Sequence, residues 1–216
     1  MIAREGHIVR WRPEGAPDWR ADAEALDAYR WERARVVLLD LTACVPWEGD
    51  PWPRRAIVWL QRFPLPLVSA LDGALGGAWV DLALAADIRV GSPSLTLTVP
   101  SELALPTVER LGILVRGTLP EPGKPLSGRW LFERGLVSAL TEAPLAEAER
   151  VATVIASRGP YAVQLGKEAI WRGLAMPLEQ ALRFETDLTL LLQTTKDRAE
   201  GVRAFLEKRP PQFEGV

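Results

Sequence analysis

Residues 66–90, PLVSALDGALGGAWVDLALAADIRV, form the stretch that decides the fold we expect for this chain. It opens with an apolar run over residues 67–71, which predicts a short buried strand. A loop with three glycines follows, and the helix formers of residues 78–86 predict a compact helix. Asp87 ends that helix, and residues 88–90 predict the next strand. We therefore expect the order strand, glycine-rich loop, helix, strand.

The glycine-rich turn has a chemical consequence at the helix start. The first N–H groups of a helix have no partners within it, and with the helix dipole they can hold an anion or a developing oxyanion. Asp81 lies three residues after Ala78 and so shares its helix face, close to an oxyanion held by the Ala78 N–H. The competing interpretation is structural. The small residues then serve close packing, and Asp81 only gains roughly 0.3–1 kcal/mol from the helix dipole.

The composition argues against several classes of partner. The chain has 216 residues, of which 48% are hydrophobic and 25% charged, with a net charge of −2. These values are ordinary for a globular protein and give no electrostatic reason to expect nucleic acid or an acidic membrane. No apolar run is long enough to span a bilayer, and no signal peptide is recognised. Cys44 is the single cysteine, so we expect no intramolecular disulfide and a cytoplasmic location.

Other chemistries are excluded by residues that the chain lacks. His7 is the single histidine, so a His-rich metal site is not expected and no metal is assigned. A Ser-His-Asp or Cys-His arrangement would need His7, which falls in a predicted strand where a structural role is favoured. Neither Gly-x-x-x-x-Gly-Lys-Ser/Thr nor Gly-x-Gly-x-x-Gly occurs, so phosphate cradles of those kinds are not expected.

The rest of the chain alternates between strand and helix patterns before it becomes wholly helical. This order predicts an α/β fold. In the first part we expect strands at 2–11 (or a hairpin), 35–41 and 94–99, and helices at 18–33 (capped by Asp18), 52–63, 106–114 and 130–134. In the second part we expect amphipathic helices at 144–158, 161–173, 178–194 and 197–208. Four such helices in a row carry more apolar faces than a small core can bury, which indicates a subunit interface.

On these residues the chain resembles the enoyl-CoA hydratase/isomerase (crotonase) family. The similar segments are Asp72-Gly73 with the glycines after it, 82–85, 86–89, 126–129, 166–173 and the terminal 200–211. Residues 135–137 resemble a Gly-Leu-Val strand of the family, so the resemblance implies a strand there. The resemblance covers nearly the whole chain, with contractions near 43–52 and 103–130. It implies a crotonase-like spiral of ββα units over residues 1–143 and a C-terminal helical oligomerisation region over 144–216. Family members usually form trimers or dimers of trimers through that region, so a homotrimer or hexamer is expected.

The resemblance also implies a substrate and a site. In the family the glycine-rich turn donates an N–H to the thioester carbonyl of a coenzyme A substrate, and Gly77 and Ala78 stand there. A second donor comes from the contracted loop, where Gly49 is the match. The two family carboxylates correspond to Asp81 and, one residue late, Glu102, since ungapped counting places Ser101 at that position; such a shift turns an extended side chain to the other side. Coenzyme A is part of the substrate, so no cofactor is expected.

Functions of different classes therefore remain open. The first is an enzyme that processes an acyl-CoA thioester as a hydratase, isomerase or hydrolase, with Asp81 as the proton-transfer group. The second is a catalytically degenerate member that binds an acyl-CoA or a partner subunit without turnover, which the contracted loops and the displaced Glu102 favour. The third is a scaffold subunit that does not bind coenzyme A. Trp79 is bulky where the family has a glycine, so we expect it to narrow the acyl channel.

Overall fold

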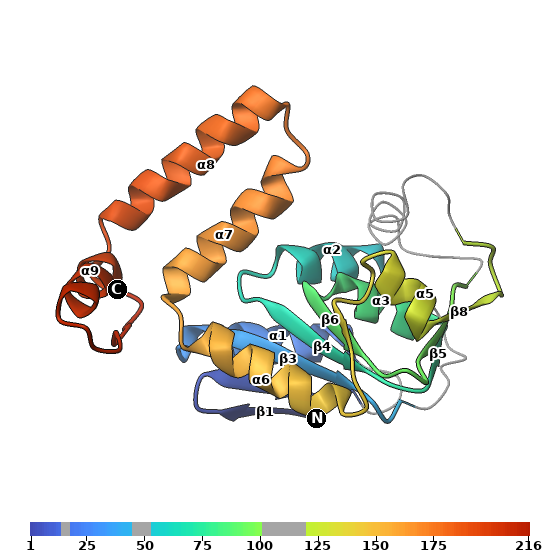
Figure 1. Ribbon diagram of the computed structural model, residues 1–216. Coiled ribbons are helices and arrows are strands. Elements are labelled where there is room, and N and C mark those ends of the chain that lie inside the picture. The colour runs from blue at the N-terminus through green and yellow to red at the C-terminus, as the bar shows by residue number, and fades with distance from the viewer. Residues whose placement is uncertain (14–17, 45–52, 101–119) are drawn as a thin grey trace.

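The structure is a computed structural model, and it describes residues 1–13, 18–44, 53–100 and 120–216 (Figure 1). The helix expected at 106–114 lies outside the described residues. Among the described helices, none is long and apolar enough to cross a membrane.

A six-stranded sheet forms the centre of the fold, in the order β1-β2-β3-β4-β6-β9. The first two strands form the expected antiparallel hairpin, and the remaining neighbours pair in parallel. Every residue of β3 and β4 is buried, as is usual for parallel strands that are covered on both faces. The strands are β1 (Ile2–Glu5), β2 (Ile8–Trp11), β3 (Val36–Leu41), β4 (Leu67–Leu71), β6 (Ile88–Gly91) and β9 (Ala139–Leu140).

Helices cover both faces of this sheet. Alternate residues of β3 belong to two apolar clusters: Val37 and Leu39 pack with the helices before β6, and Val36 and Leu38 pack with α6. Asp18 caps the first helix as expected, because its carboxylate accepts the N–H groups of Arg20 and Ala21. The helices of this part are α1 (Trp19–Trp31), α2 (Arg54–Arg62), α3 (Ala78–Ala85), α5 (Gly128–Glu133) and α6 (Pro144–Ala156).

A small second sheet lies beside the first, in the order β5-β7-β8. Its strands are β5 (Ala74–Gly76), β7 (Thr96–Thr98) and β8 (Pro125–Ser127). The glycine-rich loop that we expected after β4 therefore contains a strand, which the sequence pattern did not reveal. This strand exists because β5 pairs in parallel with β7, a tertiary contact that overrides the weak strand preference of glycine.

Two further expectations need correction. The strand expected at 135–137 lies at 139–140, because the N–H groups of Leu136 and Val137 turn back to the carbonyl of Leu131, at 2.9 and 3.2 Å. His7 lies in the tight turn between β1 and β2 rather than in a strand, and its Nδ1 is 3.2 Å from the carbonyl oxygen of Arg33.

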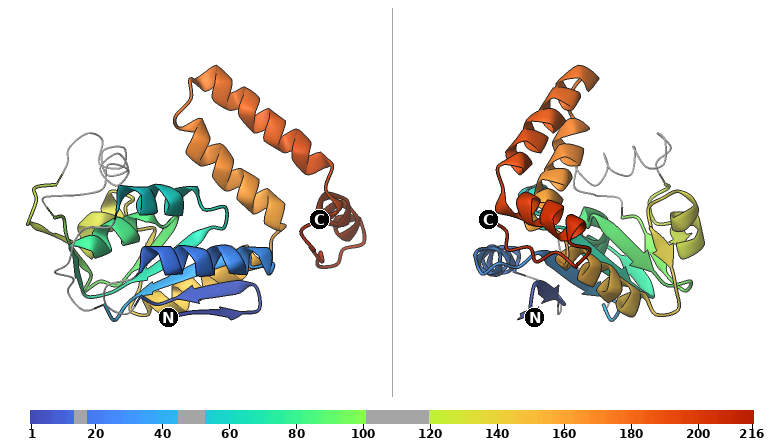
Figure 2. Two further views of the ribbon diagram at one scale, coloured as in Figure 1. Left: turned by 180° about the vertical axis from the view of Figure 1, so that it is seen from behind. Right: turned by 60° about the vertical axis from the view of Figure 1, so that its left-hand side comes forward.

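The last three helices leave the sheet. Helices α7 (Pro160–Gly173) and α8 (Leu178–Gln193) pack against each other as an antiparallel pair, and α9 (Lys196–Leu206) follows. Figures 1 and 2 show this pair projecting away from the sheet in all three views. The four helices expected after residue 143 are thus confirmed.

One half-buried carboxylate ties α7 to the sheet. Asp87, at the start of β6, accepts from Lys167 Nζ at 2.7 Å, from Trp171 Nε1 at 3.1 Å and from the Leu67 N–H at 2.8 Å. Lys167 also donates to the carbonyl of Leu65 at 3.0 Å. The Lys167 and Asp87 side chains are only 8% and 17% exposed, so this pair fixes where the projecting helices leave the core.

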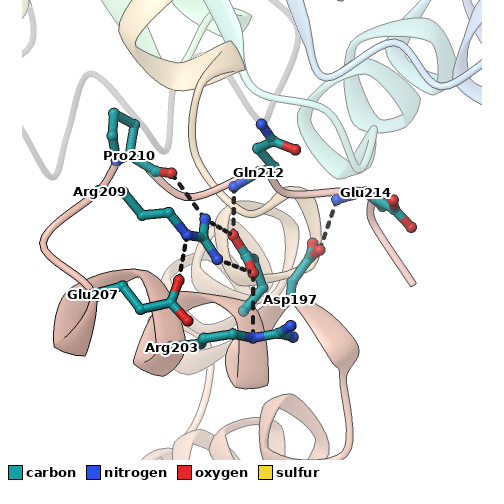
Figure 3. Close-up of polar contacts among 8 residues, drawn as sticks. Asp197, Arg203, Glu207, Arg209, Pro210, Gln212 and Glu214 are labelled. Atoms are coloured by element: carbon teal, nitrogen blue, oxygen red, sulfur yellow. Dashed lines mark hydrogen bonds and ion pairs between the residues drawn. The ribbon is translucent and has the colours of Figure 1, made fainter.

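The C-terminal residues fold back along α9 (Figure 3). The Glu200 carboxylate accepts hydrogen bonds from Nη1 and Nη2 of Arg209, at 2.6 and 3.0 Å, and from the Gln212 N–H at 2.9 Å. Asp197 accepts the N–H groups of Glu214 and Gly215. Hydrogen bonding from Arg209 and then from the Gln212 N–H lowers the pKa of Glu200 to about 2.

The tail also reaches the core. Arg35, just before β3, donates to the carbonyl of Phe213 at 2.6 Å and to that of Ala156 at 2.9 Å. The same guanidinium therefore holds the tail and the end of α6 together, next to the point where α7 begins.

The pair of Asp87 and Lys167 is open to a direct stability test. We expect Lys167→Met to lower the free energy of unfolding by about 2 kcal/mol or more, because it removes the cation that pairs directly with a half-buried carboxylate. The double variant Asp87→Asn/Lys167→Met should lose less free energy of unfolding than the two single variants, Asp87→Asn and Lys167→Met, lose together. Chemical denaturation measures both effects. The matched control is Lys124→Met, which breaks an exposed pair with Glu121 at 3.7 Å and should change stability by less than about 1 kcal/mol. Equal losses of stability in Lys167→Met and Lys124→Met would contradict the anchoring role of the Asp87–Lys167 pair.

The lowered pKa of Glu200 leads to a second prediction, which concerns how stability depends on pH. The pKa of Glu200 in the folded protein lies below the unfolded value of about 4.3. Its contribution to the free energy of unfolding is therefore present above about pH 4.3 and is lost as pH falls toward about 2. We expect the melting temperature of Glu200→Gln to fall less steeply than the parent's between pH 5 and pH 3. Glu121→Gln is the control and should keep the parental slope; parallel curves for all three proteins would overturn the prediction.

Candidate active site

The candidate site is built where the main chain passes from β5 into α3. Gly77 occupies the N-cap position with φ +58° and ψ −137°, a conformation that glycine adopts without the steric cost of a Cβ atom. This turn aims the chain directly from the strand into the helix, which begins at Ala78. The glycine at position 77 is therefore required by the backbone geometry.

The start of α3 supplies backbone donors. Gly77 offers no side chain to cap the helix, and the first N–H groups of any helix find no acceptor one turn back. The Val80 N–H bonds to the carbonyl of Gly77 at 3.2 Å, a tight first turn. The helix dipole adds partial positive charge at the same end. The Ala78 amide thus lies at the positive end of the α3 dipole.

Asp81 lies one turn into the helix, on the side of Ala78. Its exposed fraction is 0%, that of Ala78 is 2%, and every residue of α3 is buried. A carboxyl group and a helix start that are both shielded from water interact more strongly than exposed groups would. The structure therefore brings three of the expected site residues, Gly77, Ala78 and Asp81, together within one helical turn.

The remaining expected site residues lie elsewhere. Gly49, Ser101 and Glu102 fall outside the described residues. Trp79 is 1% exposed and packs within the larger apolar cluster, with the core side chains of the sheet. The expectation that Trp79 narrows an acyl channel stays a prediction.

Two cavities lie near α2, and the described residues that line them include neither Ala78 nor Asp81. A very small one of about 10 Å³ lies between α1 and α2, around Asp22 and Trp59. The larger, open one measures about 750 Å³ and follows the outer face of α2. Its described lining is Pro53, Arg55, Val58, Trp59 and Arg62.

A polar cluster that our sequence analysis missed lies at the other end of β5. Asp72 Oδ1 accepts the Gly73 N–H at 2.8 Å, the Ser94 hydroxyl at 2.9 Å and the Ser92 hydroxyl. Hydrogen bonding, chiefly from Ser92, lowers the pKa of Asp72 below its usual value. The sequence held a signal for this cluster. Leu71 pairs with Gly91 in the parallel strands β4 and β6, so the residues that follow them, Asp72 and Ser92, must lie side by side.

The C-terminal end of α3 is fixed as well. The Arg89 guanidinium, 5% exposed, donates to the carbonyls of Ala86 and Leu136. Burial lowers the pKa of Arg89 to about 10, and the neighbouring charge of Asp87 opposes that shift. Both ends of the helix are therefore tied to other elements.

Other nucleophiles and ligands gain no support from the geometry. Cys44 is half-buried, and burial raises the pKa of its thiol to about 11, so it is not a ready thiolate. Within the described ranges, no three His, Cys, Asp or Glu side chains gather as a metal site would require.

The two sheets, the buried helix after a glycine cap and the projecting helical pair define a crotonase-fold protein. A solved enoyl-CoA hydratase from Bacillus anthracis matches with a TM-score of 0.84 at 26% identity, over 100% of this chain and 99% of that one. An enoyl-CoA hydratase from Geobacillus kaustophilus has a TM-score of 0.87 at 23% identity, over 100% and 96%, and supports the fold alone.

Sequence relatives place the protein more narrowly. The family model described as Enoyl-CoA hydratase/isomerase matches residues 122–216. The putative enoyl-CoA hydratase/isomerase YngF of Bacillus subtilis is 32% identical over 76% of this chain and 67% of its own length. The 2,3-dehydroadipyl-CoA hydratase of Escherichia coli is 32% identical over 72% and 66%. The chain belongs to the enoyl-CoA hydratase/isomerase family, although it spans only 50% of one curated relative, a human methylglutaconyl-CoA hydratase.

Proposed function

We propose that this protein acts on an acyl-CoA thioester, with the thioester carbonyl held by the backbone N–H of Ala78 and Asp81 as the proton-transfer group. The observation that carries the proposal is the buried carboxylate of Asp81 beside a helix start capped by a left-handed glycine. Family membership supports the substrate class, because the relatives are named a putative enoyl-CoA hydratase/isomerase and a 2,3-dehydroadipyl-CoA hydratase. Gly77 contributes the turn that aims the amide.

A single carboxylate at this place suits a proton shift. Asp81 takes a proton from C2 of a 3-enoyl thioester, and the electron pair moves onto the carbonyl oxygen as a dienolate. The Ala78 N–H stabilises that oxygen. Asp81 then returns the proton to C4, and the product is the conjugated 2-enoyl thioester. A hydration would need a second group to position water, and Glu102 is the residue we propose for that role.

The alternative is a family member that binds acyl-CoA or a partner subunit without turnover. The observation that favours it is length: the chain spans 67% and 66% of the two curated relatives named above. Its cavity over α2 and its buried α3 would then serve binding or packing only.

We also propose that residues 144–216 mediate self-association into a trimer or hexamer. Within that region α6 packs on the sheet, while α7, α8 and α9 expose large apolar side chains. Phe205 is 82% exposed, and Leu206 and Leu178 are each 73% exposed. Large apolar side chains that gather on one region of a surface mark an interaction site more often than single ones do. A reducing cytoplasm, compatible with the lone thiol of Cys44, is the compartment that we propose.

Turnover tests the catalytic proposal. We expect the parent to convert a 3-enoyl-CoA or crotonyl-CoA, measured by the absorbance of the conjugated thioester. Asp81→Asn should lower kcat by about 10²-fold or more, because the amide cannot carry the proton. Asp18→Asn, a remote helix cap, is the matched control and should keep parental kcat.

Parental kcat in Asp81→Asn would contradict the proton-transfer role of Asp81. No parental turnover, with a melting temperature raised by CoA ligands, would favour the binding alternative; no shift with any CoA ligand would leave the scaffold role.

Light scattering tests the self-association. We expect the parent to be oligomeric at micromolar concentration and Phe205→Glu to shift it toward the monomer, because a charge would be buried in the interface. Trp31→Glu changes an equally prominent side chain, 74% exposed on α1, and should leave the assembly intact. A monomeric parent, or equal effects of both substitutions, would overturn the proposed interface.

A further inference from the structure

The proposed oxyanion donor sits at the end of a segment with little rigidity of its own. Strand β5 has three residues and lies between Gly73, with φ +69°, and Gly77, with φ +58°. Glycines in this region are the most permissive residues of a chain. The position of the Ala78 N–H therefore depends on contacts that hold β5 from outside.

The carboxylate of Asp72 makes such contacts at the start of the segment. Its Oδ1 accepts from the Gly73 N–H and from the hydroxyls of Ser92 and Ser94. The two hydroxyls also lie 2.9 Å from each other. These donors come from two loops, one that enters β5 and one that leads from β6 to β7. One oxygen atom thus joins the loops before both strands of the β5–β7 pair.

The joint continues into the ladder of the small sheet. The Thr96 N–H donates to the carbonyl of Gly73 at 2.9 Å, and Ala74 pairs with Thr96. Hydrogen bonds to an ionised carboxylate are stronger than neutral ones, and the pKa of Asp72 is lowered by these same donors, so the group is charged at neutral pH. The hydrogen bonds to Asp72 are therefore charge-assisted. They lie at the start of the β5–β7 pairing, which runs from Ala74 and Thr96 to Gly76 and Thr98.

Removing this carboxylate leaves the large sheet in place. Leu71 still pairs with Gly91, and the Ser92 N–H still bonds to the carbonyl of Leu71 at 3.0 Å. Asp72 itself is only partly buried and belongs to neither apolar cluster. The tie is thus specific to β5 rather than to the core.

We propose that Asp72 is a positioning residue for the oxyanion site, which fixes β5 and through it the Ala78 N–H. The inference rests on the proposed function for the identity of the oxygen held there. The positioning itself is a property of the chain and has a readout of its own.

Two measurements on Asp72→Ala test the inference. Hydrogen exchange followed by mass spectrometry should show exchange in residues 73–78 about 10-fold faster than in the parent, because the segment opens more often. With the thioester substrate, kcat should fall by about 10²-fold while KM stays within about 3-fold, since a displacement of about 1 Å is enough for such a loss. Asp72→Asn keeps an acceptor oxygen for the same donors and should restore most of both quantities.

Controls separate this role from a general loss of structure. Asp18→Ala removes another carboxylate that accepts two backbone N–H groups, on α1, and should leave both readouts at parental values. If Asp72→Ala does not fold, Ser94→Ala replaces it, because that exposed hydroxyl supplies one of the three bonds and its loss should give a smaller change in the same direction.

Each other outcome decides against the inference or against the proposed function. Parental exchange in residues 73–78 would overturn the inference, as would faster exchange with unchanged kcat or an Asp72→Asn variant no better than Asp72→Ala. A parent without turnover would defeat the proposed function alone, because the exchange measurement still decides whether Asp72 positions β5.

Discussion

Helix α3 lies wholly inside the protein, and its orientation is set by polar ties at both ends. At the C-terminal end, Asp87 bonds to the start of β4 and to α7, while Arg89 bonds to the carbonyls of Ala86 and Leu136. At the N-terminal end, the left-handed Gly77 joins α3 to β5, which pairs with β7. A helix start held in this way is a fixed set of N–H donors, which is what stabilisation of a developing charge requires.

The same ties connect the candidate site to the projecting helices. Asp87 lies two residues after the end of α3, and its carboxylate accepts hydrogen bonds from Lys167 and Trp171, both in the second half of α7. The apolar side chains that we assign to self-association therefore belong to a unit anchored two residues beyond the site helix. The Arg35 contact with Phe213 adds a second anchor at the base of that unit. The proposed assembly and the candidate site thus share the same supports.

Much of the fold was accessible from the sequence, because local patterns were strong. The apolar runs of β3 and β4, the Asp18 cap and the four C-terminal helices all carry their signals within a few residues. The helix spacing of Ala78 and Asp81 placed them on one face without any tertiary information. Strand β5 was missed because Ala74–Gly76 has no strand preference of its own and exists only through β7. The Asp87–Lys167 tie was missed because 80 residues separate its partners.

The carbonyl stretch of a bound thioester tests the site most directly. A CoA thioester labelled with ¹³C at the carbonyl carbon, bound to the parent protein, is compared with the same molecule in water by isotope-edited vibrational spectroscopy. If the Ala78 N–H at the start of α3 receives that oxygen, the bound band moves to lower frequency than in water, because a preorganised donor polarises the C=O bond. A bound thioester whose carbonyl band stays at or above its frequency in water would contradict the central claim.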